Sequence, residues 1–174
     1  KKKEKHRPLQ ETVVAPAALH DLVLEKAAAK GDAAAQLSLG EAYYKGQGVA
    51  QDFEKAVGWY YKAAEQGHAD AQCRLGIAYY KGEGVAQDYE KSVEWFEKAA
   101  AKGQAEAQCG LGNAYFIGKG VAQDYEKSVG WFEKAAAKGQ VDAQYGLGNA
   151  YYIGKGVAQD FEKAVGWYEK AAEQ

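Results

Sequence analysis

The sequence has little of the chemistry that enzymes and metal proteins use. Its 174 residues include no methionine, two cysteines, two prolines and three histidines. Two cysteines are too few for a disulfide framework, and His6, His20 and His68 lack the spacing to one another or to a cysteine that a metal site needs. No Ser/His/Asp or Cys/His set falls on one face of a predicted helix. We therefore expect no catalytic residue, no metal and no cofactor.

Long apolar runs and an excess of positive charge are also missing. No run approaches the roughly 18 apolar residues that a membrane-spanning helix needs, so we expect no membrane span. Lys and Arg number 22 against 24 Asp and Glu, and the formal net charge is −2. Residues 1–7 alone carry +4, which leaves −6 for the rest of the chain. An acidic body argues against nucleic-acid binding, because phosphate recognition needs a basic stripe along the fold.

The first 18 residues differ from the rest of the chain. They hold both prolines and the basic run but no helical periodicity, which predicts a flexible basic leader over 1–18. The run is a solvated tail, the flank of a removed membrane anchor or an arm for an acidic partner, and the sequence leaves these open. Since residue 1 is not Met, we interpret the chain as processed or as a fragment. Unpaired cysteines favour a reducing compartment, but bacterial cytoplasmic, periplasmic and secreted locations all stay open.

What the sequence has in plenty is repetition. Four tryptophans recur at 36-residue steps, and four glycines and four aspartates recur with them: Trp59, Trp95, Trp131 and Trp167; Gly31, Gly67, Gly103 and Gly139; Asp52, Asp88, Asp124 and Asp160. A period of this length is typical of a solenoid. We therefore predict four repeats, at 31–66, 67–102, 103–138 and 139–174. Residues 19–30 match only the second half of a repeat, which predicts a helix that caps the first one.

Each repeat reads as two helices. The first runs from about 33 to 45 and stops at Gly46, a residue suited to the left-handed turn that ends helices. Asp52 is a good N-cap for the second helix, whose apolar residues form two stripes at helical spacing. Glycine inside the first helix, as at Gly40, costs about 1 kcal/mol relative to alanine, so we expect two helix backbones to meet there. Gly58 becomes glutamate in the second repeat, which predicts an exposed, tolerant position. The fold class is therefore all-α.

The second repeat carries a specific pattern. Residues 71–100 read A-Q-x-x-L-G-x-x-Y-x-x-G-x-G-V-x-x-D-x-x-K-x-x-x-W-F-x-K-A-A. This pattern resembles the Sel-1-like repeat, a relative of the tetratricopeptide repeat. The resemblance implies a right-handed superhelix whose first helices line a concave surface, and a role as an adaptor or scaffold for protein complexes. Secreted cysteine-rich members pair two cysteines within a repeat. Here Cys73 and Cys109 come one per repeat, so neither that pairing nor the β-lactam binding suggested for that subgroup transfers.

Comparison of the four copies separates fixed from variable positions of the first helix. Gln36, Gly40 and their neighbours at 42 and 43 are the same in every copy, whereas the residues at 37, 38, 41 and 45 change. At about 100° per residue the two sets fall on opposite faces. A solvent-exposed helix face that varies between copies is normally polar. This variable face instead holds isoleucines, and an aromatic row lies beside it. We predict a groove lined by Glu41, Tyr44, Lys45, Arg74, Ile77, Tyr80, Lys81, Asn113, Phe116, Ile117, Tyr145, Asn149, Tyr152 and Ile153. A plain solvent face, or an aromatic row that belongs to the core, are the alternatives.

The side chains that line the predicted groove change in character along the array, and this change suggests a ligand. Repeats one and two supply charged side chains and repeats three and four supply apolar and amide ones: Glu41, Lys45, Arg74 and Lys81, then Asn113, Ile117, Tyr145, Asn149 and Ile153. We predict a peptide or helix with an acidic end and an apolar end, bound by a non-catalytic protein-interaction scaffold. An alternative is an assembly element that stacks end to end, since terminal repeats normally need a polar outer face. A small-molecule-binding or hydrolytic role is the third reading.

Overall fold

The computed structural model describes residues 16–174, and within this range the chain forms nine helices and no strand. The helices are α1 (Pro16–Ala29), α2 (Ala33–Lys45), α3 (Phe53–Glu65), α4 (Ala69–Lys81), α5 (Tyr89–Ala101), α6 (Ala105–Ile117), α7 (Tyr125–Ala136), α8 (Val141–Ile153) and α9 (Phe161–Ala172). Equivalent helices begin 36 residues apart, which confirms the all-α class and the predicted period. We call α2, α4, α6 and α8 the first helices and α3, α5, α7 and α9 the second helices of the repeats.

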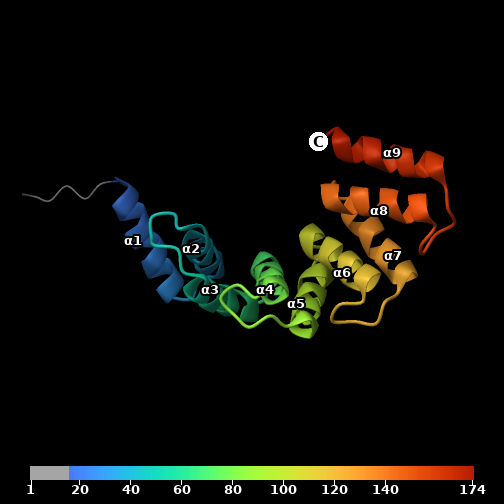
Figure 1. Ribbon diagram of the computed structural model, residues 1–174. Helices are drawn as coiled ribbons and strands as arrows, with labels where there is room; N and C mark the ends of the chain where they lie inside the picture. The colour runs from blue at the N-terminus through green and yellow to red at the C-terminus, as the bar shows by residue number, and fades with distance from the viewer. Residues whose placement is uncertain (1–15) are drawn as a thin grey trace, which may run out of the picture.

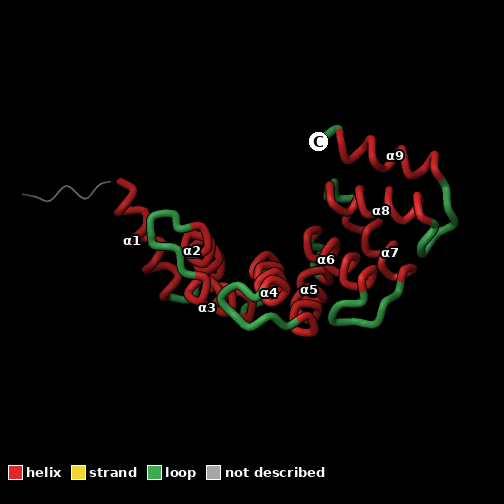
Figure 2. The backbone as a smooth tube through the Cα atoms, in the orientation of Figure 1, coloured by secondary structure: helices red, strands yellow, loops and turns green. Residues whose placement is uncertain are grey.

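The helical hairpins stack into a curved right-handed solenoid. Figures 1 and 2 show an arc with α2, α4 and α6 on its inner side and α3, α5 and α7 on its outer side. Each second helix packs against its own first helix and, where another repeat comes next, against the first helix of that repeat. The core is accordingly a series of small clusters along the array, each built from adjacent hairpins. This arrangement leaves one edge of every first helix facing the inside of the arc.

The turn inside each hairpin is set by its local sequence. Gly46 ends α2 in the left-handed conformation with φ of 68°, where a side chain would be strained. The Asp52 carboxylate then accepts a hydrogen bond of 2.9 Å from the Lys55 backbone N–H. That hydrogen bond lowers the pKa of the Asp52 carboxyl, because it favours the charged form. Both predicted helix boundaries are confirmed.

The glycine inside the first helix lies closest to an aromatic ring, and not to another helix backbone. A Cβ added at Gly76 would lie 2.5 Å from Cδ1 of Phe96, and one at Gly40 would lie 2.6 Å from the ring of Tyr60. The neighbour is thus an aromatic side chain of the paired second helix, where we expected helix backbone. Beyond the backbone of its own helix, no atom lies within 4 Å of the Cβ position at Gly58, as an exposed and tolerant site requires.

A buried glutamine joins each of the first three repeats to the preceding helix. Gln72 Nε2 donates to the carbonyl of Ala64 at 3.1 Å, and Gln36 Nε2 donates to that of Ala28 at the same distance. Both carbonyls lie in the last turn of a helix, where carbonyl groups lack intrahelical partners. Because Gln36 contacts α1 as Gln72 contacts α3, α1 occupies the place of a second helix ahead of the first repeat.

The start of α1 corrects one expectation. Residues 1–15 of the expected leader lie outside the described residues, but Pro16 and the two residues after it belong to α1. Proline fits the first turn of a helix because the N–H that it lacks would have no intrahelical partner there. A proline near the end of the expected leader was therefore a helix start.

Candidate protein-interaction groove

The inner side of the arc carries a hollow of about 660 Å³ that crosses α2, α4 and α6. We call it the central hollow. Nine predicted groove residues line it: Glu41, Tyr44, Lys45, Arg74, Ile77, Tyr80, Lys81, Asn113 and Ile117. The structure thus brings together side chains from three repeats that are far apart in the sequence.

A second hollow of about 710 Å³ lies between α8 and α9, and we call it the terminal hollow. Three predicted groove residues, Tyr145, Asn149 and Tyr152, line it together with Tyr168 of α9. The remaining two predicted residues line neither hollow. Phe116 packs edge-on against Tyr125, with 5.3 Å between ring centroids, and Ile153 is exposed at the end of α8.

The exposure of these side chains varies along the groove. Ile117 is 50% exposed and Tyr145 is 57% exposed. Ile77 and Tyr44 are half-buried and pack against the clusters of core residues beneath them. Ile77 and Tyr44 therefore help to close the core at repeats one and two, whereas Ile117 and Tyr145 are open apolar surface at repeats three and four.

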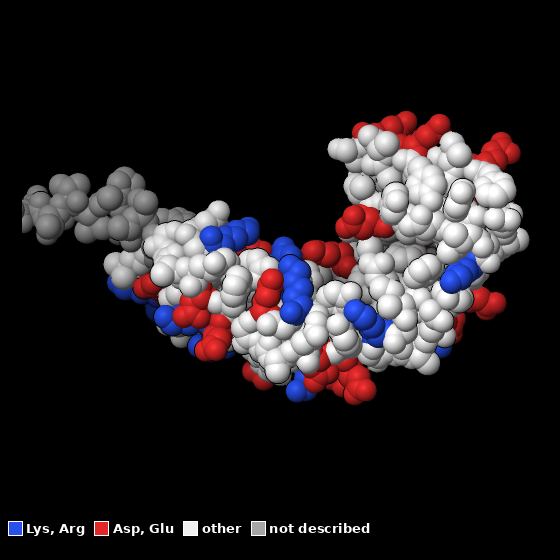
Figure 3. All heavy atoms as spheres, viewed as in Figure 1, with Lys and Arg blue, Asp and Glu red and all other residues white. Residues whose placement is uncertain are grey.

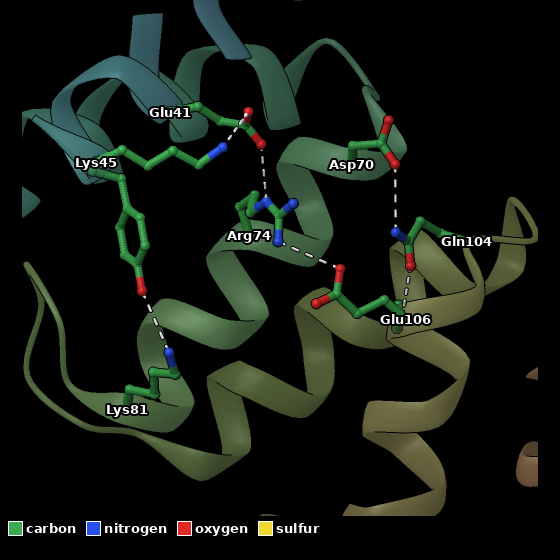
Figure 4. Close-up of polar contacts among 9 residues, drawn as sticks. Glu41, Lys45, Asp70, Arg74, Lys81, Gln104 and Glu106 are labelled. Atoms are coloured by element: carbon green, nitrogen blue, oxygen red, sulfur yellow. Dashed lines mark hydrogen bonds and ion pairs between the residues drawn. The ribbon is translucent and has the colours of Figure 1, made fainter. Parts of the chain in front are cut away.

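The basic residues of the central hollow are paired. Arg74 Nε lies 3.3 Å from Glu41 Oε1, and its Nη1 lies 3.4 Å from Glu106 Oε2, as Figure 4 shows. Lys45 Nζ lies 3.6 Å from Glu41 Oε2. These half-exposed pairs are each worth about 0–1 kcal/mol, but they hold the guanidinium between α2 and α6. The cation is thus neutralised within the molecule.

Lys81 is engaged in the same way. Its Nζ donates to Tyr44 Oη at 3.3 Å and lies 3.7 Å from Glu83 Oε2, while Tyr44 Oη donates to the same carboxylate at 2.7 Å. The hydrogen bond with Tyr44 raises the pKa of Lys81. In Figure 3 atoms of both charge signs alternate over the first repeats, whereas the surface over α8 and α9 is largely uncharged, with carboxylates at its edge.

This pairing corrects the predicted charge gradient. The lining of the central hollow carries four carboxylates (Glu41, Glu83, Glu106 and Asp142) against three cations. The region predicted to attract an acidic end therefore has no free positive charge. Glu106 and Asp142 were not among the predicted groove residues, although each lies seven residues before a variable position of the groove. Positions seven apart share a helix face, so the signal was present.

The two cysteines are buried thiols. Cys109 is 4% exposed and Cys73 is 1% exposed, and neither forms a disulfide. Burial raises the pKa of Cys109 to about 12 and raises that of Cys73 as well. A neutral buried thiol is a poor nucleophile and behaves as a small apolar group.

Across residues 16–174, no three His, Cys, Asp or Glu side chains gather as metal ligands would. In the same range, no helix combines the length and the apolar character needed to cross a bilayer.

The fold and its inner surface define a helical-repeat solenoid. The sequence matches the family model of the Sel1 repeat at residues 33–68, 69–104, 105–140 and 141–174. The chain therefore belongs to the Sel1 repeat family. The family repeats start at the first helix, two residues after the glycine at which we began each repeat. Proteins of this family generally act as protein-interaction scaffolds and are typically not enzymes.

Solved structures with the same fold come from several bacteria. A protective antigen of uropathogenic Escherichia coli is 45% identical with a TM-score of 0.84, over 88% of this chain and 33% of that one. A Sel1 repeat protein from Oxalobacter formigenes is 35% identical with a TM-score of 0.85, over 89% of this chain and 62% of that one. Helicobacter pylori cysteine rich protein B is 28% identical with a TM-score of 0.55, over 71% of this chain and 88% of that one. No curated protein matches the chain.

The chain spans one third of the length of the Escherichia coli antigen and about three fifths of that of the Oxalobacter protein. What it binds must therefore be argued from its own surface.

Proposed function

We propose that the chain is a non-catalytic scaffold that binds a peptide or helical segment of a partner protein in its inner groove. The observation that supports this most directly is the central hollow, which is built from three successive first helices. Its volume of about 660 Å³ falls in the range of about 300–1,000 Å³ that is usual for ligand sites. A hollow of this size suits a short segment better than a folded domain.

The chemistry of the lining supports a polypeptide ligand. Ile117 offers exposed apolar surface at the end of α6, and Ile77 continues it on α4. Asn113, exposed between them on α6, carries an amide that both donates and accepts hydrogen bonds. Backbone amides of an extended peptide need such a partner. The paired state of Arg74 and Lys81 removes the reason to expect an acidic end on the ligand.

Two matched substitutions test the groove. Ile117→Glu places a charge in the central hollow, and Val165→Glu places the same charge on α9 outside both hollows. The two side chains are similarly exposed, at 50% and 53%, and both are β-branched. Circular dichroism must first show that both variants are as helical as the native chain. Partners are then captured from a proteome extract, and the affinity of each one is measured with purified protein.

We expect Ile117→Glu to weaken the interaction at least tenfold, since the few residues that dominate an interface lie near its centre and cost about 2 kcal/mol or more when they are lost, and Val165→Glu to leave it unchanged. Equal affinity for all three proteins would contradict the groove assignment.

End-to-end assembly is the second candidate, and one observation favours it. Val165 is 53% exposed on α9, whereas its equivalents Val57, Val93 and Val129 are at most 6% exposed because the next repeat covers them. Loss of binding in Val165→Glu with full binding in Ile117→Glu would move the function to this terminal face. The same substitution pair therefore separates the two candidates.

A further inference from the structure

Arg74 occupies a position of the central hollow that the neighbouring repeats build around a guanidinium group. Its Nε lies 3.3 Å from Glu41 Oε1 of α2, and its Nη1 lies 3.4 Å from Glu106 Oε2 of α6 (Figure 4). A guanidinium group carries several donors in a fixed plane, which suits carboxylates on two sides of it. The chain thus shows within itself which chemical group this position of the hollow binds.

The same position recurs one repeat further along, but glycine replaces the arginine. Gly110 stands 36 residues after Arg74, and Asp142 stands 36 residues after Glu106. Both Gly110 and Asp142 line the central hollow. Among the described residues, Asp142 forms no ion pair. The hollow therefore presents a carboxylate there without an internal cation.

The difference between the two positions comes from the residue that precedes each carboxylate. Glu106 is neutralised by an arginine of the repeat before its own, and the repeat before Asp142 offers only the hydrogen of Gly110 at that place. All three repeats of this comparison, the second to the fourth, are described by the structure. The unpaired state of Asp142 towards the hollow thus follows from the change of arginine to glycine between α4 and α6.

The two buried thiols agree with the equivalence of the carboxylates. Burial raises the pKa of Cys73, and the nearby Glu106 carboxylate adds to the rise. Burial raises the pKa of Cys109 to about 12, and the Asp142 carboxylate adds to it in the same way. A negative charge raises the pKa of a thiol because it opposes formation of the thiolate. Each carboxylate therefore lies beside the cysteine of the preceding repeat.

The other surfaces around Gly110 are apolar. Ile77 stands 36 residues after Glu41, is half-buried and lines the central hollow. Phe96 lines it as well, and a Cβ added at Gly110 would lie 2.8 Å from Cε2 of its ring. Arginine packs its aliphatic stem and the plane of its guanidinium group on such surfaces, whereas the compact ammonium group of lysine stays hydrated. One carboxylate on an apolar surface therefore suits an arginine side chain.

We propose that the central hollow binds an arginine side chain of the partner polypeptide. The guanidinium group lies beside Gly110 and pairs with the Asp142 carboxylate, as that of Arg74 pairs with Glu106 one repeat earlier, and the stem packs on Ile77. The proposal rests on the proposed function, since the arginine belongs to the segment bound in the groove. It also reverses the sign of the charge that the sequence alone predicted for the ligand.

The test begins with a displayed library of random peptides selected on the native full-length chain. Selected peptides are synthesised twice, with each arginine kept or replaced by citrulline, which keeps the shape of the side chain and removes its charge. Affinities are measured by fluorescence anisotropy for the native chain and for Asp142→Asn. Ile117→Glu serves as the control for the groove itself. Circular dichroism must first show that every variant is as helical as the native chain.

Asp70→Asn is the matched control for Asp142→Asn. Asp70 is the equivalent aspartate in the first turn of α4, is exposed like Asp142 and does not line the central hollow. Loss of a carboxylate at this place weakens the interaction with the helix dipole equally in both variants. A difference in binding between them therefore reports the hollow and not the helix.

We expect citrulline to weaken binding at least about fivefold for the native chain and for Asp70→Asn. Fivefold is the upper end for an exposed ion pair, and the bound peptide excludes part of the water from this one. Peptides with arginine and with citrulline should bind Asp142→Asn equally well.

Three results would overturn a claim, and they are distinct. Peptides that need Ile117 but contain no arginine, or bind equally well with citrulline, would overturn this inference and leave the proposed function standing. A citrulline effect of the same size in Asp142→Asn would overturn it too, because the arginine would then bind elsewhere. Peptides that ignore Ile117→Glu would overturn the proposed function.

The source of the arginine is tested separately. The chain has one other arginine, Arg7, in its basic leader, so the leader of the same or a second copy is the competing donor. Arg7→Gln should leave the affinities of the selected peptides unchanged. A higher affinity in that variant would mean that Arg7 competes for the hollow, and would overturn the assignment to a separate partner polypeptide.

Discussion

Replacing Gly112 by alanine should destabilise the array although alanine is the better helix former. A Cβ at this position would lie 2.5 Å from Cδ1 and Cε1 of Phe132, whereas carbon atoms in contact prefer about 3.5–4.0 Å. The ring cannot move away, because Gly146 of the next repeat already packs against its other side. A Cβ added at Gly146 would lie 2.9 Å from Cζ of the same ring. Phe132 is 2% exposed and is thus held between two successive first helices.

The matched control is Gly130→Ala in the same repeat. Apart from its own helix backbone, no atom lies within 4 Å of its Cβ position, so that variant gains the helix propensity of alanine, about 1 kcal/mol, without a clash. Gly112→Ala gains the same propensity and adds an overpacking cost of about 1–3 kcal/mol. The propensity cancels in the comparison. We therefore expect Gly130→Ala to be more stable than Gly112→Ala by about 1–3 kcal/mol.

Urea unfolding followed by far-ultraviolet circular dichroism measures the difference, with the slope of the transition compared to confirm that all proteins unfold alike. Phe132→Leu introduced into Gly112→Ala should recover part of the loss by relieving the ring. If Gly112→Ala is as stable as Gly130→Ala, the reasoning about the ring between the two helices is wrong.

Three further predictions concern the repeat junction, the cap and the thiols. Gln108→Leu removes the side-chain hydrogen bond to the buried carbonyl of Ala100, which keeps only its bond from the Gly103 N–H, and should lower the free energy of unfolding by about 0.5–1.5 kcal/mol in urea titration; an unchanged midpoint would contradict this. The pKa of the Asp124 carboxyl is lowered by its hydrogen bond from the Lys127 N–H, so its stabilisation is complete above the ordinary carboxyl range and is lost as pH falls through the folded-state pKa. Asp124→Ala should accordingly lower the thermal midpoint at neutral pH and lose that difference in acid. Cys109 should resist a thiol reagent at pH 8 until the chain unfolds, and rapid labelling of the native protein would refute its burial.

Much of the fold could be predicted because its signals are local or periodic. Gly46 ends one helix and Asp52 begins the next, each through backbone groups only a few residues away. The sequence of a single repeat is therefore enough to predict both helix boundaries. The 36-residue period then extends this prediction to all four repeats. The inner groove was predictable for a related reason: comparison of four copies separates the packed face of the first helix, which includes Gln36 and Gly40, from the face that is free to vary.

Contacts between repeats depended on the tertiary structure. Arg74 is neutralised by Glu41 and Glu106, which lie in the repeats before and after its own, and their approach depends on how far each hairpin is rotated and shifted relative to the next. The same geometry places the Lys119 ammonium group over the rings of Tyr80 and Tyr89, which belong to the preceding repeat.

Periodicity determines that this chain is a solenoid and which helix faces are variable. The charge that the groove presents is set by through-space pairing across the stacked hairpins, because the electrostatic field of a side chain depends on its distance to partners from other repeats. That distance is a property of the assembled superhelix, and no single repeat contains it.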